Sequence, residues 1–263
     1  MTERDTPHPA RGRTAITVVS NRSVVEAIAS PTVEVVDVSI ADDAPASIRK
    51  RIVSLCNEHE TPIELVSRSE LSRRSRQPRH DQGVCARIRL MLVSEVEQFV
   101  DSITGKRAAN PTRVIALDGI TNPQNIGMIV RSAAAAGIDA ILWPLAGSPW
   151  IDGLVIKSSA ATIYRMRVIR THTLEEGLHE LKRSGFRTVG LDARAGRSLY
   201  SLEPLHRVVI VIGSETLGLT ETVRKLVDEL VEIPIHPDVE SLNAAAAATL
   251  ACFHVTGRSH GKK

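Results

Sequence analysis

The sequence predicts an α/β protein with two parts: a small N-terminal α/β module and a larger domain built on a parallel sheet. After residue 112, short apolar segments alternate with segments of helical periodicity. One of them, VVIVI at 208–212, is apolar throughout, which is typical of a strand in a parallel sheet that helices cover on both faces. With 263 residues, the chain is long enough for one or two domains. The predicted divisions are a flexible tail at 1–13, an N-terminal domain at 14–98, a linker at 99–112 and a main domain at 113–263.

The elements of the N-terminal module follow from the spacing of apolar residues. The predicted order is a helix at 22–29, a strand at 33–38, a helix at 46–58, and strands at 62–66 and 83–89. Residues 68–89 hold seven arginines against Glu70 and Asp81, a local charge of +5 (7 − 2). Arginine clusters suit contacts with phosphate groups, and a solvated, flexible loop is the alternative interpretation.

In the main domain, strands and helices alternate along the chain. Strands are predicted at 114–117, 140–143, 167–169, 188–191, 208–212 and 230–233, and helices at 125–136, 152–161, 174–184, 221–226 and 242–255. Ligands of open parallel sheets bind beyond the carboxyl ends of the strands. The strand-to-helix junctions are therefore the candidate sites.

Composition and motif searches exclude several classes of protein. A net charge of +3 does not by itself indicate a nucleic-acid-binding protein, and 3% aromatic residues cannot easily supply stacking platforms for single-stranded RNA. The N-terminus lacks the apolar core of a signal peptide, and no run of about 18 apolar residues predicts a membrane span. Three dispersed cysteines indicate reduced thiols in the cytoplasm, and the nine histidines lack metal-ligand spacing, so we expect no metal. No GxGxxG, Walker A or GxSxG motif is present.

The first candidate junction spans 117–137. Pro123 and Asn125 mark a tight strand-to-helix turn, and Gly127 allows close backbone approach. Arg131 follows on a helix whose apolar residues predict that it is buried. Burying an arginine costs free energy unless the side chain faces a ligand or an acid. A structural ion pair is the alternative for Arg131.

Two further junctions lie at 208–223 and 231–253. Gly213 ends an apolar strand, and Glu215 follows before Gly218. Glu215 is either a catalytic residue or a local helix cap or ion-pair partner. In the last junction, Ser241 is the expected N-cap of an alanine-rich helix. Asn243, next to it, can bond to a ligand or to the backbone.

Taken in order, the three junctions closely resemble the signature motifs of the SpoU/TrmH family, the RNA 2′-O-ribose methyltransferases of the SPOUT superfamily. The resemblance covers about 112–257. GVCARI at 83–88 also resembles the closing strand of the family's ribosomal-protein-like substrate-binding domain, which points to the ribosomal RNA branch with the thiostrepton-resistance type. The matching residues are Asn125, Ile126, Gly127 and Arg131, then Gly213, Ser214, Glu215 and Gly218, then Ile233, Pro234, Ser241, Leu242 and Asn243.

The resemblance implies an α/β domain with a deep trefoil knot, a homodimer, and S-adenosylmethionine as cofactor. It places cofactor contacts at Leu191, Gly213, Gly218, Ile233 and Leu242. It places the catalytic pocket at Asn125, Arg131, Glu215, Ser241 and Asn243. Lys157 would lie near the RNA or the cofactor. The departures from the family pattern are Asn122 in place of Asp, Ala161 in place of Gly, and the alanine run 244–248.

The expected function is methylation of a ribose 2′-hydroxyl of RNA, with 23S ribosomal RNA as the first choice. We expect Arg73, Arg74, Arg76 and Arg79 to contact RNA phosphates, since they carry the concentrated charge of 68–89. Two roles fit the resemblance: routine ribosomal RNA modification, and protection of the ribosome from an antibiotic. The alternatives are a non-catalytic RNA-binding or ribosome-assembly protein on the same fold, and a tRNA methyltransferase.

Overall fold

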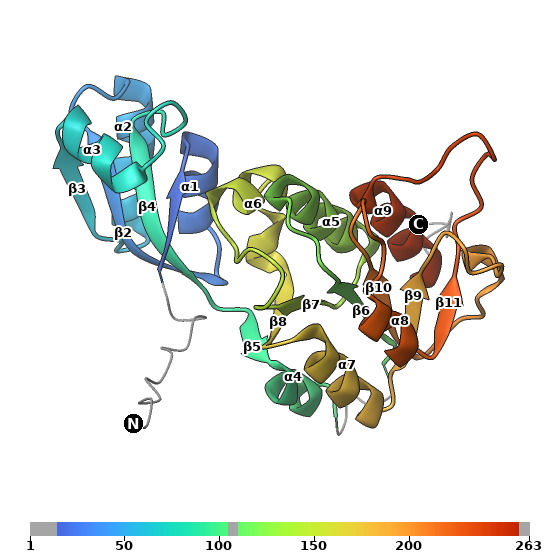
Figure 1. Ribbon diagram of the computed structural model, residues 1–263. Helices are drawn as coiled ribbons and strands as arrows, with labels where there is room; N and C mark the ends of the chain where they lie inside the picture. Colours follow the sequence, from blue (N-terminus) through green and yellow to red (C-terminus); the bar gives the residue numbers. More distant parts are fainter. Residues whose placement is uncertain (1–14, 105–109, 258–263) are drawn as a thin grey trace, which may run out of the picture. The chain divides into compact units, whose positions relative to one another are not determined.

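The structure, a computed structural model, describes residues 15–104 and 110–257. The chain divides into two compact units, Met1–Leu92 and Val93–Lys263 (Figure 1). The predicted tail at 1–13 lies outside the described residues. Within them, no helix combines the length and the apolar character that crossing a bilayer requires.

The first unit is a four-stranded sheet with helices. Its strands are β1 (Ile16–Val19), β2 (Val33–Ala41), β3 (Ile63–Val66) and β4 (Val84–Leu90), in the order β1-β4-β2-β3. Its helices are α1 (Asn21–Ile28), α2 (Ala46–Glu58) and α3 (Arg68–Ser75). β2 and β3 run parallel, and the other pairs are antiparallel. The apolar side chains Val18, Val38, Ile40, Ile52 and Ile88 are buried in this unit, as the strand and helix patterns predict.

The arginine-rich stretch is more ordered than the predicted loop. Residues 68–75 form α3, which Ser67 caps by accepting a hydrogen bond from the Glu70 N–H at 3.2 Å. The turn that follows is held by the fully buried carboxylate of Asp81, which accepts from Gly83 N, from Ser75 Oγ and from Arg68. The flexible-loop interpretation is therefore wrong for 68–75, because local capping and a buried acid fix the backbone.

The predicted boundary after residue 98 and the predicted linker at 99–112 differ from the structure. The division falls after Leu92, and α4 (Val96–Ser102) belongs to the second unit. Val96, Phe99 and Ile103 follow one another at helical spacing and are buried in its core. The first part of the predicted linker, 99–102, is thus the end of a packed helix, and another part, 105–109, lies outside the described residues.

The second unit is built on a seven-stranded sheet in which every pair of neighbours is parallel, as predicted. The strand order is β11-β9-β10-β6-β7-β8-β5. The strands are β5 (Val93–Glu95), β6 (Thr112–Leu117), β7 (Ala140–Pro144), β8 (Arg167–Thr171), β9 (Arg187–Leu191), β10 (Arg207–Ile212) and β11 (Glu229–Val231). β5 was not predicted, because three residues carry too little pattern.

Helices cover both faces of this sheet, as the apolar strands require. The helices are α4, α5 (Pro123–Ala136), α6 (Gly153–Ser158), α7 (Leu174–Arg183), α8 (Glu221–Leu226) and α9 (Ala244–Val255). In Figure 1, α5, α6 and α9 lie on one face, and α4, α7 and α8 lie on the other. Gly127 brings α5 against α6, because a Cβ there would lie 2.8 Å from the Val155 carbonyl oxygen. The Ser132 and Thr249 hydroxyls join α5 to α9 at 2.7 Å.

Two predicted helices have different ends in the structure. The helix expected at 152–161 stops at Ser158, where the Ser158 and Ser159 hydroxyls donate to carbonyls of the last turn. Ala160 and Ala161 are then left-handed, at φ 50° and 62°, and a 3₁₀ turn follows. The last helix begins at Ala244 instead of 242, because Asn243 and not Ser241 is its N-cap.

Candidate active site

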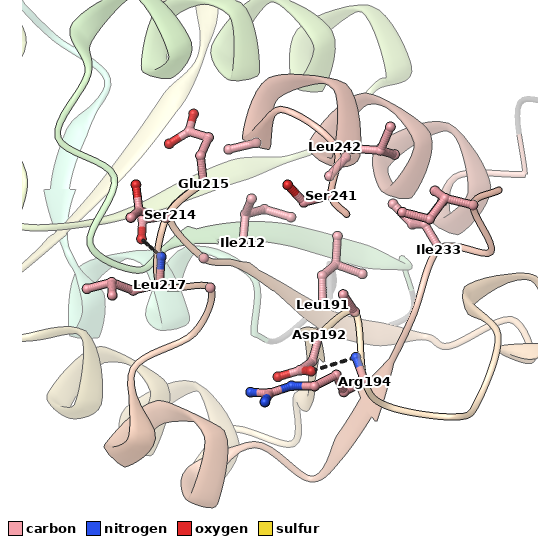
Figure 2. A pocket seen from close by; sticks show the side chains of 17 residues that line it. Leu191, Asp192, Arg194, Ile212, Ser214, Glu215, Leu217, Ile233, Ser241 and Leu242 are labelled. Carbon is pink, nitrogen blue, oxygen red and sulfur yellow. Dashed lines mark hydrogen bonds between the residues drawn. The ribbon is translucent and has the colours of Figure 1, made fainter. Parts of the chain in front are cut away.

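A cavity of about 270 Å³ opens at the carboxyl ends of β9 and β10 (Figure 2). Its walls are the ends of these strands, the 213–218 loop, and the segment that leads from β11 into α9. The volume is close to the lower end of the range of about 300–1,000 Å³ for ligand pockets. The residues predicted to contact a cofactor all line it: Leu191, Gly213, Gly218, Ile233 and Leu242.

The loop after β10 is folded back tightly on itself. Ser214 N donates to Gly218 O at 3.1 Å, and Gly218 N donates to Ser214 O at 2.9 Å. Gly213 permits this fold, because a Cβ at that position would overlap the backbone of Gly218. Gly218 has φ +67°, a left-handed conformation that glycine adopts without strain. The two glycines of the motif therefore shape the cavity wall.

Three predicted catalytic residues, one from each junction, are joined by hydrogen bonds. The Asn125 amide donates to the Glu215 carboxylate, and the Asn243 amide donates to Asn125 Oδ1 at 3.3 Å. Asn243 Oδ1 meanwhile accepts from Ala245 N at 2.9 Å, which caps α9. Asn125 is nearly buried, whereas Glu215 is exposed and lines the cavity. The sequence therefore brings side chains from α5, from the loop after β10 and from the start of α9 to one point.

The alternative role of Glu215 as a helix cap is not what the structure shows. Thr220 caps α8, with its hydroxyl accepting from Val223 N at 3.4 Å. Ser241 lines the cavity, although it is not a cap. The carboxylate of Glu215 is thus held at the cavity by the amide of Asn125.

Arg131 and Lys157 are exposed, and no hydrogen bond joins either of them to this cluster. Arg131 lies on α5, and the expectation of a buried arginine is wrong, because its position faces away from the buried side of the helix. Among the described residues neither side chain makes an ion pair, so the structural ion pair considered for Arg131 is not observed there. Both cations are therefore available to an anionic ligand.

Sequence inspection missed two acids that directly follow strands of this edge. Asp118, after β6, is 4% exposed and accepts from Thr220 N at 2.6 Å. Burial raises the pKa of Asp118, and the hydrogen bonds from Thr220 only partly offset this. Asp192, after β9, lines the cavity. An acid immediately after an apolar strand was the available signal for both.

The arginines predicted to contact phosphates fall into two groups. Arg73 pairs with Glu70, and Arg74 bonds to Glu64 at 2.6 Å and to Glu70 at 2.8 Å, so both charges are already compensated. Arg76 and Arg79 are exposed, and neither forms an ion pair with another residue of the described chain. Of the seven arginines of 68–89, the two on the turn after α3 are therefore the ones whose charge no ion pair of the described residues compensates.

No group of three His, Cys, Asp or Glu side chains suited to a metal is found within 15–104 and 110–257. The three cysteines are free and buried. Burial raises the pKa of the Cys56 thiol to about 11 and that of Cys252 to about 12. Thiols of this kind are protonated at neutral pH and are poor nucleophiles.

Comparison with known proteins identifies the family. A model described as the SpoU rRNA Methylase family matches residues 112–253, more than half of the chain. The chain belongs to this family. A second model, RNA 2′-O ribose methyltransferase substrate binding, matches residues 21–90. These matches confirm the predicted family, the methyltransferase activity and S-adenosylmethionine as the cofactor of this SpoU protein.

Relatives and solved structures agree with this membership. The SpoU protein is 36% identical over 188 residues to the 23S rRNA (guanosine-2′-O-)-methyltransferase RlmB of Xanthomonas campestris pv. campestris, covering 70% of this chain and 73% of the relative. It is 32% identical over 243 residues to a Mycobacterium ulcerans protein named "Uncharacterized tRNA/rRNA methyltransferase", covering 91% and 77%. The crystal structure of AviRb from Streptomyces viridochromogenes, in complex with AdoMet, shares the fold with a TM-score of 0.79 at 22% identity, covering 94% and 92%.

Proposed function

We propose that this SpoU protein transfers a methyl group from S-adenosylmethionine to a ribose 2′-hydroxyl of 23S ribosomal RNA in the cytoplasm. The observation that carries the proposal is the hydrogen-bonded chain from Glu215 through Asn125 to Asn243 beside the cavity, inside the segment that the family model matches. The 23S substrate is supported by the RlmB relative, whose name states that activity.

The cavity is suited to the cofactor. Apolar side chains of Leu191, Ile212 and Ile233 line it, together with polar side chains that include Asp192, Ser214 and Glu215. Pockets of this composition hold small organic ligands through apolar surface and orient them by a few polar contacts. When bound, S-adenosylmethionine supplies a methyl group that its sulfonium already activates for transfer.

The residues around the cavity then have distinct roles. A ribose hydroxyl is a weak nucleophile until its proton is accepted or its developing negative charge is stabilised. In this proposal Glu215, held by Asn125, orients the hydroxyl. Arg131 contributes through charge and orientation instead of accepting the proton. Ser241 completes the polar rim.

The RNA contacts of the first unit are proposed at Arg76 and Arg79. The buried Asp81 carboxylate holds their turn by accepting hydrogen bonds from Gly83 N and Ser75 Oγ. A fixed turn carrying unpaired arginines is suited to phosphate contacts, whose strength falls with salt. Lys157 on α6 is the corresponding candidate in the second unit, because it is exposed and unpaired among the described residues.

A homodimer is proposed on the exposed apolar surface of α5 and α9. In α9 no residue is an acid, a lysine or an arginine, and its exposed positions are apolar. A surface of this kind favours a second copy over solvent. We expect light scattering to give a mass of twice the 28.6 kDa of one chain. We expect Phe253→Asp to reduce the measured mass to that of a single chain. The exposed apolar residues of the two helices are Met128, Ala135, Ala246, Leu250 and Phe253.

The trefoil knot of the family is proposed for the second unit. It is supported by contacts between the segment after β9 and the segment after β11. Glu232 N donates to Arg197 O at 2.8 Å, and Leu199 N donates to Glu232 O at 2.7 Å. The Tyr200 and His254 rings then meet edge to face, with centroids 5.6 Å apart.

The decisive experiment is mapping of ribose methylation in RNA from cells with and without the gene, followed by transfer to the two RNA pools in vitro. A single 23S position that loses its methyl group without the gene is expected. Methylation of transfer RNA alone would favour the tRNA alternative. Absence of S-adenosylmethionine binding in calorimetry would favour the non-catalytic RNA-binding alternative. Comparison of antibiotic sensitivity in the same two strains tests the resistance role.

A further inference from the structure

Asp192 is a nearly buried acid in the wall of the cavity. It directly follows Leu191 at the end of β9 (Figure 2). Its side chain is 8% exposed. Oδ1 accepts from Arg194 N at 2.8 Å, and the carboxylate also pairs with Arg224 of α8. A carboxylate with so little exposure is costly unless its charge is compensated, which Arg224 does here.

The place of Asp192 in the sheet resembles a known arrangement for binding nucleosides. β9 lies parallel to β10, with Gly190 opposite Val211. The glycine turn at Gly213 and the acid at Asp192 therefore stand at the carboxyl ends of neighbouring strands. In dinucleotide-binding α/β folds, an acid near the glycine turn accepts a hydrogen bond from a ribose hydroxyl. Here Asp192 precedes Gly213 in the chain, so the likeness lies in space and not in sequence.

We propose that Asp192 accepts hydrogen bonds from the ribose hydroxyls of the adenosyl cofactor, with Arg224 holding the carboxylate in place. Each carboxylate oxygen has two acceptor sites, and the contacts to Arg194 N and Arg224 leave capacity on the carboxylate. A vicinal diol offers two O–H donors to match. This inference rests on the proposed function, because it takes the adenosyl cofactor as the occupant of the cavity.

Asp192 has a second possible role, in which it only fixes its own loop. Its bond to Arg194 N forms a local turn, and its pair with Arg224 ties that turn to α8. Loss of either contact would then deform the cavity for any ligand. The two roles differ in one measurable respect: only direct binding makes affinity depend on the ribose hydroxyls.

The test is calorimetry of the full chain with S-adenosylhomocysteine and with its 2′-deoxy and 3′-deoxy analogues. Wild type is expected to bind at least one analogue roughly 10- to 100-fold more weakly, as for a hydrogen bond to a charged group. Asp192→Ala is expected to bind all three ligands with nearly the same low affinity, and Asp192→Asn is expected to lie between. The matched control is Asp228→Asn, which removes a charge paired with Lys182 and bonded to Thr188, outside the cavity lining. It should keep the wild-type discrimination.

The outcomes separate this proposal from the proposed function. Equal affinity of wild type for the three ligands overturns the role of Asp192 but leaves cofactor binding and methyl transfer intact. An equal penalty for each missing hydroxyl in wild type and Asp192→Ala also overturns it, and assigns Asp192 to the loop. No binding of S-adenosylhomocysteine by wild type overturns the proposed function as well. The analogue series on wild type needs no variant, so it holds even if Asp192→Ala unfolds.

Discussion

Replacing Gly213 with alanine should separate the shape of the cofactor loop from the stability of the fold. The added Cβ would overlap the Gly218 backbone, which cannot move aside as a flexible side chain could. The turn must then open, and the two backbone hydrogen bonds between Ser214 and Gly218, at 3.1 and 2.9 Å, are lost. At about 0.5–1.5 kcal/mol each, the loss is roughly 1–3 kcal/mol. Expressed in cofactor affinity, this is a weakening of about 5- to 150-fold.

The assay is calorimetric titration with S-adenosylhomocysteine, with thermal unfolding measured in parallel. Gly147→Ala is the matched control, because Gly147 has φ +77°, has no atom within 4 Å of an added Cβ, and lies outside the cavity lining. It should cost about 1–2 kcal/mol of stability through backbone strain and leave affinity unchanged. Wild-type affinity in Gly213→Ala would refute the reasoning, since the turn would then tolerate the Cβ without opening.

Three other substitutions test the site from different sides. Arg131→Lys keeps the charge but loses the planar fork, so we expect methyl transfer to fall at least tenfold with cofactor affinity unchanged; full activity would contradict the proposed role. Asn125→Ala should lower kcat by about 10-fold or more, because Glu215 loses its amide donor. An unchanged rate in single-turnover assays would contradict the role of Asn125. Asp118→Asn should remove a pH dependence. Burial raises the folded pKa of Asp118 above its unfolded value of about 3.9. Its contribution to stability is therefore full below that unfolded value and is lost as pH rises through the folded pKa. As pH falls from 7 to 4, the free energy of unfolding measured by denaturation should rise in wild type relative to the variant. Parallel pH profiles of the two proteins would argue against this.

The main domain was predictable because its signals are local. A strand such as β10 is apolar from Val208 to Ile212, and the helices are amphipathic or capped, so the period and length of the apolar pattern assign them. The motif residues Gly213 and Gly218 could also be found in the sequence. Only glycine suits this turn, because a Cβ at 213 would overlap the backbone and because residue 218 has a positive φ. The cofactor loop was therefore visible before its geometry was known.

Charge was harder to interpret than hydrophobicity. The arginines of 68–89 were counted as one basic cluster, but Arg74 reaches Glu64 and Ser39, which lie 10 and 35 positions away in the chain. Pairing of this kind depends on how β2, β3 and α3 pack, and a local count of charges cannot contain it. The position of α4 likewise depends on tertiary packing, because its Phe99 is buried in a core formed with residues of distant strands.

The sequence alone established the family, the parallel sheet and the residues of the three motifs, because these depend on residue type, spacing and order along the chain. Folding in three dimensions was needed to join Asn125 to Glu215 and Asn243, 90 and 118 positions away, and to place Asp192 beside the glycine turn. The physical reason is that parallel strands gather their carboxyl ends at one edge whatever their order in the chain. Contacts at that edge follow strand order in the sheet, β11-β9-β10-β6, which the linear sequence does not state.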